Sequence, residues 1–210
     1  MRSKGMGNLL QISGLSDSIA SMREDGRITK RCKRHDTSGQ AHELTFSCYK
    51  NQILLSKSRT CQWLVMSILR AKEKHNFSLW AYVFMPDHVH LLIFPRNKDY
   101  SISKILQSIK QPVSAKAIAY LKEHAPASLK KLSTGQKSRP YLFWQKGGGY
   151  DRNMTEVDTL IESVRYIHLN PVKKKLVEKP NDWYYSSAVQ WDGLDAGPLP
   201  IDKSDWPAFT

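Results

Sequence analysis

The chain is short of cysteine, and the cysteines that it has are scattered. Its three copies, Cys32, Cys48 and Cys61, form no CxxC pair. An odd and dispersed set argues against a disulfide framework and against a zinc ribbon. We therefore expect a protein of a reducing compartment that relies on a packed core.

Long apolar segments are also missing. No run approaches the roughly 20 apolar residues that a helix needs to cross a bilayer. The first residues, MRSKGMGNLLQISG, carry basic side chains without the sustained apolar stretch of a secretory signal. The expectation is a cytoplasmic protein with no membrane partner, and no segment indicates an obligate protein partner.

Acidic residues are the third deficit. The 210 residues contain 32 Lys and Arg against 19 Asp and Glu, which leaves a formal net charge of +13. A field of that sign attracts polyanions and says little about fold. An unusually solvated basic surface is one interpretation, and a nucleic acid partner is the commoner one. The hydrophobic content of 40% suffices for one globular core.

Aromatic residues are absent from residues 1–40, which hold the basic cluster Lys30-Arg31-Cys32-Lys33-Arg34-His35. This composition favours a flexible extension over a packed layer. Two interpretations stay open: an arm that contacts DNA, or an over-long start before a natural first residue at Met22. We therefore divide the chain into a basic extension (1–40), one domain (41–188) and an irregular tail (189–210).

The domain begins with patterns typical of short strands and a longer helix. HELTFSCY (42–49) alternates polar and apolar residues, which predicts a strand. Apolar spacing predicts a helix from Leu54 to about His75. FSLWAYVFM (77–85) and HVHLLIF (88–94) then predict a hairpin, because Pro86-Asp87 breaks the extended run between them.

A second helix and a last strand complete the pattern. Residues 101–124 predict a helix that Pro112 bends or interrupts, because proline lacks an amide donor. Residues 141–152 suggest a strand with a glycine-rich kink. The order β-α-β-β-α-β, followed by one more helix, describes an α+β fold with a ferredoxin-like antiparallel sheet and helices packed on it.

The final helix has a predicted beginning and a predicted end. Thr155 and Asp158 have the spacing of a capping box, which would start the helix near Thr155. The pair Asn170-Pro171 would close it, because a residue before proline avoids helical geometry.

The first candidate site is the run His88-Val89-His90. Side chains alternate along a strand, so the two imidazoles share one face while Val89, Leu91 and Ile93 point toward the core. Two neighbouring neutral imidazoles can bind a divalent metal and leave positions open for a substrate. The pattern alone is weak, since two half-buried histidines hydrogen-bonded on a sheet fit it as well.

The second candidate is Tyr166 on the final helix. At about 100° per residue it lies nearly opposite the apolar stripe, on the side of Glu162 and Asn170. A core tyrosine would lie within the stripe, and a surface tyrosine that covers the sheet is the other interpretation. His168 falls near the apolar side, and we assign it to packing. The stripe consists of Val157, Leu160, Ile161, Val164 and Ile167.

A chemical argument links the two candidates. Free tyrosine has a pKa of about 10, so it is a poor nucleophile at neutral pH. A cation beside a scissile phosphate would offset the charge that develops in the transition state. His88, His90 and the amide oxygen of Asn170, four residues after Tyr166, would hold such a cation.

Four segments occur in a specific order: MPDHVHLL (85–92), FWQKGGGYDRN (143–153), YIHLNPVKKKLV (166–177) and DWYYSSA (182–188). This set resembles the REP-associated tyrosine transposases of the single-tyrosine HUH superfamily, with a similarity that runs from about Ser38 to Ala188. The resemblance implies a ferredoxin-like fold with a C-terminal catalytic helix and dependence on Mg or Mn. It also implies cleavage of single-stranded DNA near palindromic hairpins through a 5′-phosphotyrosine intermediate.

The resemblance assigns roles residue by residue. His88 and His90 match the HUH pair, Tyr166 matches the nucleophile, and Asn170 matches the polar residue that completes the metal site. That residue is a glutamine in the insertion-sequence relatives, so Asn170 is the most divergent of the four. The N-terminal extension and the Gly147-Gly148-Gly149 run depart from the shortest family members.

Basic and aromatic residues are the candidates for DNA binding. Each neutralised phosphate adds affinity that salt removes by counterion release, and Arg152 beside the glycine run is the favoured contact. Trp80, Tyr82, Trp144 and Tyr150 could stack on unpaired bases, although core packing is favoured for the two tryptophans. The candidate lysines are Lys104, Lys110, Lys130, Lys131, Lys173 and Lys174.

Three classes of function compete, and the net charge of +13 disfavours one of them, a metal-dependent enzyme unrelated to nucleic acid. The first is a metal-dependent single-strand DNA endonuclease or transposase that acts in transposition or in REP-element processing. The second is a non-catalytic module that binds single-stranded nucleic acid, since a ferredoxin-like sheet also serves that purpose. A pure binder needs neither HxH nor YxxxN, so the enzyme is favoured. A mobile transposase and a domesticated hairpin processor fit the sequence equally well. The sequence does not specify the DNA target, the choice between Mg and Mn, or the oligomeric state.

Overall fold

The computed structural model describes residues 21–22, 28–29, 36–147, 149–194 and 197–207. The chain divides into two units, Met1–Lys33 and Arg34–Thr210. In the first unit the two-residue strands β1 (Ser21–Met22) and β2 (Ile28–Thr29) pair antiparallel. The basic cluster at residues 30–35 lies outside the described residues, so the flexibility and DNA contact expected of it stay predictions.

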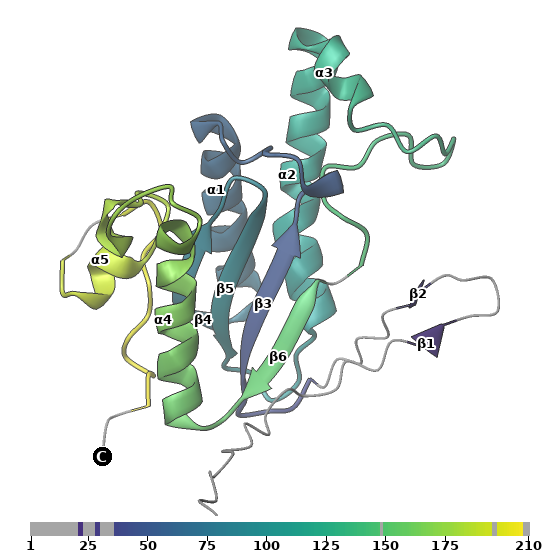
Figure 1. Ribbon diagram of the computed structural model, residues 1–210. Helices are drawn as coiled ribbons and strands as arrows, with labels where there is room; N and C mark the ends of the chain where they lie inside the picture. The colour runs from purple at the N-terminus through teal and green to yellow at the C-terminus, as the bar shows by residue number, and fades with distance from the viewer. Residues whose placement is uncertain (1–20, 23–27, 30–35, 148, 195–196, 208–210) are drawn as a thin grey trace, which may run out of the picture. The chain divides into compact units, whose positions relative to one another are not determined.

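The second unit is built on a four-stranded antiparallel sheet (Figure 1). Its strands are β3 (Ala41–Ser47), β4 (Phe77–Phe84), β5 (His88–Pro95) and β6 (Tyr150–Met154). They lie side by side in the order β4-β5-β3-β6, and every pairing is antiparallel. The first and third strands along the chain therefore occupy the centre, as in a ferredoxin-like sheet, and the predicted α+β fold is confirmed.

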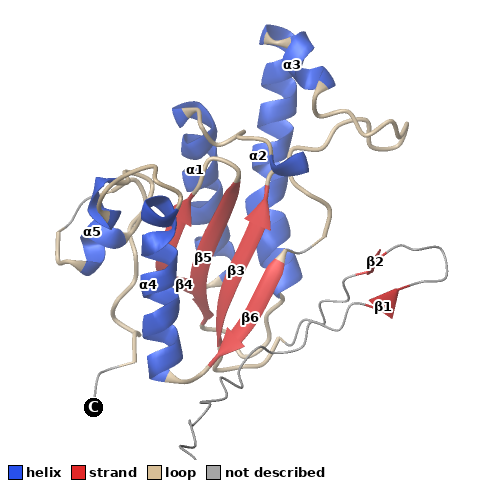
Figure 2. Ribbon diagram, in the orientation of Figure 1, coloured by secondary structure: helices blue, strands red, loops and turns tan. Residues whose placement is uncertain are grey.

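Helices cover both faces of the sheet (Figure 2). Helices α1 (Ser58–His75) and α2 (Ile102–His124) pack on one face, and α4 (Val157–Lys173) packs on the other. None of the helices in the described stretches has both the length and the apolar character needed to span a membrane. The shorter elements are η1 (Tyr49–Asn51), α3 (Pro126–Lys130), η2 (Pro180–Asp182) and α5 (Ala188–Trp191).

The alternation of side chains along each strand gives the sheet two different faces. The α1–α2 face carries large apolar residues that are almost completely buried, among them Phe46, Leu91 and Ile93. Each such side chain contributes roughly 1.5–3 kcal/mol through removal from water. The α4 face carries a second apolar cluster in which Val83 and Leu92 meet the helix. The predicted core side of the HxH strand is therefore confirmed.

The predicted start of the first helix at Leu54 is wrong. Helix α1 begins at Ser58, and residues 54–57 form a turn. The amide of Leu55 donates to the carbonyl of Pro86 at 2.9 Å, and its side chain joins the core. This contact with the distant hairpin loop holds the segment outside the helix, and local apolar spacing cannot reveal it.

The last helix starts near Thr155 as predicted, at Val157, but its predicted capping box and its predicted end are wrong. Glu156 occupies the N-cap position without a capping side chain, and Thr155 only bonds the carboxylate of Glu156 at 3.4 Å. At the other end α4 continues through Pro171 to Lys173. A proline so close to the end removes a single helical hydrogen bond, and its fixed φ suits the helix.

Two further sequence expectations need correction. Pro112 does not interrupt α2, which continues through it with its inner side buried. The strand expected over residues 141–152 is shorter, since β6 begins only at Tyr150. Before that point the segment makes isolated bridges, one of them between Cys48 and Trp144. The glycine-rich stretch thus precedes the strand and does not kink it.

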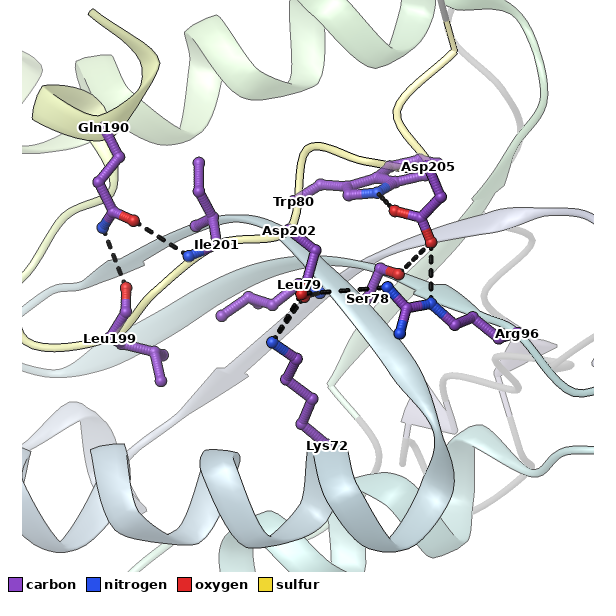
Figure 3. A network of polar contacts seen from close by, with 10 residues as sticks. All are labelled: Lys72, Ser78, Leu79, Trp80, Arg96, Gln190, Leu199, Ile201, Asp202 and Asp205. Carbon is purple, nitrogen blue, oxygen red and sulfur yellow. Dashed lines mark hydrogen bonds and ion pairs between the residues drawn. The ribbon is translucent and has the colours of Figure 1, made fainter. Parts of the chain in front are cut away.

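The described residues after α5 form no helix or strand, yet part of this segment docks along β4 (Figure 3). The amide of Asp202 donates to the carbonyl of Leu79 at 2.8 Å, and its carboxylate pairs with Lys72 at 2.7 Å. Leu199 is completely buried in the core. A second carboxylate, that of Asp205, accepts hydrogen bonds from Ser78, Trp80 and Arg96.

Candidate active site

Two histidines of β5 and one tyrosine of α4 meet on the α4 face. The ring centroids of His88 and His90 are 4.9 Å apart, and those of His90 and Tyr166 are 5.6 Å apart. Strand alternation brings the two imidazoles together, and the helical position opposite the main apolar stripe brings Tyr166 over them. The structure therefore places three of the four predicted site residues next to one another.

Each imidazole is oriented through its Nδ1 atom. His88 Nδ1 lies 2.7 Å from a carboxylate oxygen of Asp87, and an ionised carboxylate can only accept a hydrogen bond. His90 Nδ1 lies 2.8 Å from the hydroxyl of Thr45, the residue directly opposite it on β3. When Nδ1 donates in this way, the lone pair of Nε2 is left to accept or to ligate.

The Nε2 atom of His90 has no hydrogen-bond partner among the described residues, although it is buried. Burial lowers the pKa of His90 to about 3, and the neighbouring His88 contributes to the same shift. The ring is therefore neutral near pH 7. A buried, neutral imidazole nitrogen without a partner is costly unless something binds it, and a divalent cation is a suitable ligand.

The side chain of Asn170 is bound to the backbone of its own helix, at Tyr166. Its side-chain amide donates to the backbone carbonyl of Tyr166 at 2.8 Å, and the residue is buried. Among the described residues, no hydrogen bond joins its side chain to His88 or His90. The Tyr166 side chain is 44% exposed, so its hydroxyl is accessible to a large substrate. The ammonium of Lys173 lies 4.8 Å from the centroid of the Tyr166 ring.

A cleft of about 500 Å³ opens beside these residues. It lies between the sheet and α4, and its lining includes His90 and Tyr166 together with Tyr150 and Arg152 of β6. Glu43 also lines it, accepts a hydrogen bond from Ser163 at 3.0 Å and lies opposite Arg152 in the strand register. Burial raises the pKa of Glu43, while the hydrogen bond from Ser163 and the charge of Arg152 oppose that shift.

The predicted DNA-binding residues divide into several groups. Arg152 lines the cleft, as does the half-exposed Tyr150, whereas Trp80, Tyr82 and Trp144 are buried in the core. Base stacking by Tyr82 is therefore excluded in this arrangement, and the expected packing of both tryptophans is confirmed. Lys173 contacts the Tyr166 ring, and Lys110 lies on α2 across the sheet. The remaining lysines are exposed and outside the cleft: Lys104, Lys130, Lys131 and Lys174.

Three residues of this site escaped the sequence analysis: Glu43, Thr45 and Asp87. The alternating pattern of residues 42–49 does place Glu43 and Thr45 on one face, away from Leu44 and Phe46. What it lacks is the register that sets Thr45 opposite His90, since register depends on contacts between distant segments. His168 behaves as predicted, because it is buried and its Nε2 lies 2.8 Å from the Ser187 hydroxyl.

The donor atoms suit a divalent cation. Among the described residues no group of three or more His, Cys, Asp and Glu side chains could hold a metal. The predicted donors are different: two imidazole nitrogens and the amide oxygen of Asn170. Imidazole and amide ligands leave open coordination positions, as a site that must admit a phosphate requires. The buried Nε2 of His90, which no other described residue binds, makes the residues present fit such an ion.

Comparisons with known proteins agree with this geometry. Residues 37–170 match the family model described as "Transposase IS200 like". A Haemophilus influenzae protein whose name assigns it to the REP-associated tyrosine transposases is 33% identical over 122 residues, which cover 55% of this chain and 61% of the relative. The chain thus spans less than two thirds of that relative's length.

A solved structure supports the fold. It is described as a REP-associated tyrosine transposase bound to a REP hairpin, and it matches with a TM-score of 0.62 at 22% identity. The match covers 87% of this chain and 96% of the other. At that identity the likeness shows the fold alone. The family match extends over more than half of the sequence, and it includes both histidines, the tyrosine and Asn170. The chain therefore belongs to the IS200-like transposases, and it is a homologue of the REP-associated tyrosine transposases.

Proposed function

We propose that this protein is a metal-dependent single-strand DNA endonuclease in which Tyr166 is the nucleophile. The observation that supports it most is the pairing of an accessible tyrosine with a buried imidazole nitrogen that has no hydrogen-bond partner among the described residues, at ring centroids 5.6 Å apart. A module that only binds nucleic acid gains nothing from that pairing. The same arrangement suits a phosphate held between the tyrosine oxygen and a cation.

His88 and His90 would hold the cation, Mg or Mn, and Asn170 would complete the set through its amide oxygen. When bound, the ion supplies positive charge that polarises the phosphate and offsets the charge of the transition state. Asp87 and Thr45 engage the Nδ1 atoms of the two imidazoles, so Nε2 is the nitrogen that each ring would offer to a cation. Lys173 adds positive charge near the Tyr166 ring, where it can attract the phosphate of a bound strand.

The proposed step exchanges one phosphodiester for another. The Tyr166 oxygen attacks phosphorus, the bond between phosphorus and the 3′ oxygen of the preceding nucleotide breaks, and that oxygen leaves as a 3′ hydroxyl. The phenolic proton is lost in the attack, and the leaving oxygen gains one. The product is a 5′-phosphotyrosine, whose retained bond energy allows the reverse reaction to rejoin DNA.

The substrate we propose is single-stranded DNA beside a palindromic hairpin. The cleft offers Arg152 for a phosphate and the half-exposed ring of Tyr150 for an unpaired base. A phosphate in a regular duplex cannot easily reach a site in which a tyrosine and a cation must flank it. The structural relative described as bound to a REP hairpin is consistent with a folded strand as the ligand.

The nucleophile is tested by covalent trapping. Wild-type protein, a labelled single strand with a hairpin, and Mn should yield a protein–DNA adduct that survives denaturing electrophoresis. Tyr166→Phe should yield none, because it removes only the attacking oxygen, while DNA affinity and unfolding temperature stay unchanged. Tyr184→Phe is the matched control, since Tyr184 is 66% exposed and does not line the cleft. Adduct formation by the Tyr166 variant at the wild-type rate would refute the assignment.

The substrate form is tested by a parallel assay at about 0.15 M salt. The hairpin-flanked single strand should be cut, a perfect duplex of the same sequence should not, and EDTA should stop cutting until Mg or Mn is restored. Binding without any cutting under all conditions would favour the non-catalytic module. Equal cutting of duplex and single strand, or of RNA and DNA, would indicate an unselective nuclease.

A further inference from the structure

A second hollow lies across the sheet from the active-site cleft, and we call it the α2 groove. It is bounded by α2 on one side and by residues 139–147 on the other, with a volume of about 520 Å³. Its charged side chains are Lys110, Arg139 and Lys146, and no acidic residue is among the described residues that line it. The cleft holds Glu43 and Glu162, so the two hollows differ in charge.

Amide side chains supply the rest of the polar lining. Gln107 and Gln111 project from α2 one helical turn apart, and Gln145 faces them from the other wall. Amides donate and accept hydrogen bonds without adding negative charge. Three cations and three amides in one hollow suit a ligand that carries repeated negative charge with neutral acceptors between, as a sugar–phosphate backbone does.

The walls of the α2 groove are fixed to the core. The indole of Trp144 donates to the carbonyl of Lys110 at 2.9 Å, and the amide of Gln145 donates to the carbonyl of Ser47 at 2.9 Å. The ammonium of Lys110 donates to the carbonyl of Gly147 at 3.2 Å, which joins the two walls. A preformed groove loses little freedom when a ligand binds, and this favours affinity.

The α2 groove leads toward the cleft around the β6 edge of the sheet. A smaller hollow of about 100 Å³ shares Lys110 and Lys146 with it and reaches Gly149. The next residue, Tyr150, lines the cleft. At Gly149 the backbone passes so close to β3 that a Cβ atom would lie 1.8 Å from the carbonyl oxygen of Thr45, and its φ is +72°. Only glycine fits there, so Gly149 keeps the chain that leads into Tyr150 close against β3.

We propose that the α2 groove binds the DNA backbone outside the segment held at the active site, as a second and separate footprint. The inference rests on the proposed function for the identity of the ligand. A strand in the cleft beside Tyr150 would pass the β6 edge and enter a hollow whose charged groups are all positive. The groove thereby adds affinity that does not depend on base sequence or on chemistry at Tyr166.

The test measures binding only. The parent protein and every variant carry Tyr166→Phe and contain no metal, so cleavage cannot interfere. The probe is a fluorescein-labelled oligothymidylate of about 15 nucleotides, near the upper site size of single-strand binders. Arg139→Gln with Lys146→Gln should weaken binding about tenfold to thirtyfold at 0.15 M salt, and lower the slope of log affinity against log salt by about 1.4, the value for two lost phosphate contacts.

Two matched variants distinguish binding in the α2 groove from a general effect of surface charge on DNA affinity. Lys57→Gln with Arg70→Gln removes the same charge from exposed positions outside every hollow described above, and should weaken binding far less. Arg139→Lys with Lys146→Arg keeps the charge and should retain wild-type affinity. Equal losses from the two charge-removing pairs would overturn the groove as a binding site. A parent protein that binds no oligothymidylate would instead contradict the proposed function itself.

Discussion

The two faces of the sheet are formed by the same four strands and serve different ends. On the α1–α2 face, residues such as Phe46 and Leu91 are at most 1% exposed and interlock with two helices. On the α4 face, α4 and the C-terminal segment cover the apolar part around Val83 and Leu92 and leave His90 at the border of an open cleft. One face is a closed core, whereas the other combines packing with polar chemistry.

The difference shows how a small sheet carries a site without losing its core. Because side chains alternate, His90 and Leu91 are sequence neighbours whose environments have nothing in common. The polar residues of the α4 face bond one another in pairs, Thr45 with His90 and Glu43 with Ser163, which offsets the cost of burying them. A shift of register by one residue would exchange the two sets and destroy both faces.

The largest effects should come from substituting those two neighbours. His90→Ala should abolish adduct formation and the binding of Mn measured by calorimetry, with an unfolding free energy close to wild type. Leu91→Ala should cost about 2–5 kcal/mol of stability, because it opens a cavity in the closed core. Its folded fraction should still bind Mn and cleave. Similar losses of metal binding in both variants would mean that the faces are not functionally separate.

A smaller effect is expected from the residue that orients His90. Thr45→Val keeps the shape and the β-propensity of the side chain but removes the hydroxyl 2.8 Å from His90 Nδ1. Loss of such a partner commonly lowers metal affinity about 10- to 100-fold. The measurement is Mn affinity by titration, with unfolding by urea as a check on the fold. Thr45→Ser should restore the Mn affinity. If Thr45→Val and Thr45→Ser bind Mn equally well, the contact has no orienting role.

The smallest effect concerns the segment that completes the α4 face at its β4 side. The indole of Trp206 packs edge-on against that of Trp80, with ring centroids 4.8 Å apart, and the Trp80 indole donates to the carboxylate of Asp205. Asp205→Asn should cost about 1–3 kcal/mol, because the hydrogen bonds to a charged acceptor are weakened. Urea unfolding at pH 7 measures the loss, and tryptophan fluorescence reports whether the segment detaches. Cleavage should be unchanged, since Asp205 does not line the cleft.

The pH dependence of that variant follows from the sign of the shift. Burial raises the pKa of Asp205, but the hydrogen bonds from Ser78, Trp80 and Arg96 outweigh it and leave the pKa below its ordinary value. A carboxylate with a lowered pKa stabilises the fold above the unfolded pKa of about 3.9, and that contribution is lost as pH falls through the folded pKa. Wild type and Asp205→Asn should therefore differ at pH 7 and converge once the pH lies below the lowered pKa of the folded-state carboxyl. A constant difference would rule out a charge effect.

Several features could be predicted from the sequence because they depend on local periodicity. Alternation placed His88 and His90 on one face and Leu91 and Ile93 on the other, and the helical repeat placed Tyr166 away from the main apolar stripe. The order of strand and helix patterns predicted the α+β sheet. These inferences need only the geometry of one element at a time, and the family resemblance joined them into one site.

The remaining features were decided by tertiary structure, because they depend on which distant segments meet. The register of β3 against β5 sets Thr45 opposite His90, and no local pattern specifies it. Leu55 leaves a helical pattern because it bonds the hairpin at Pro86, and α4 continues past Asn170 into the turn that brings Lys173 to Tyr166. The α2 groove exists only because Trp144 and Gln145 are tied to α2 and β3. Periodicity is a property of one segment, whereas register, helix ends and hollows arise from long-range contacts that compete with local preference.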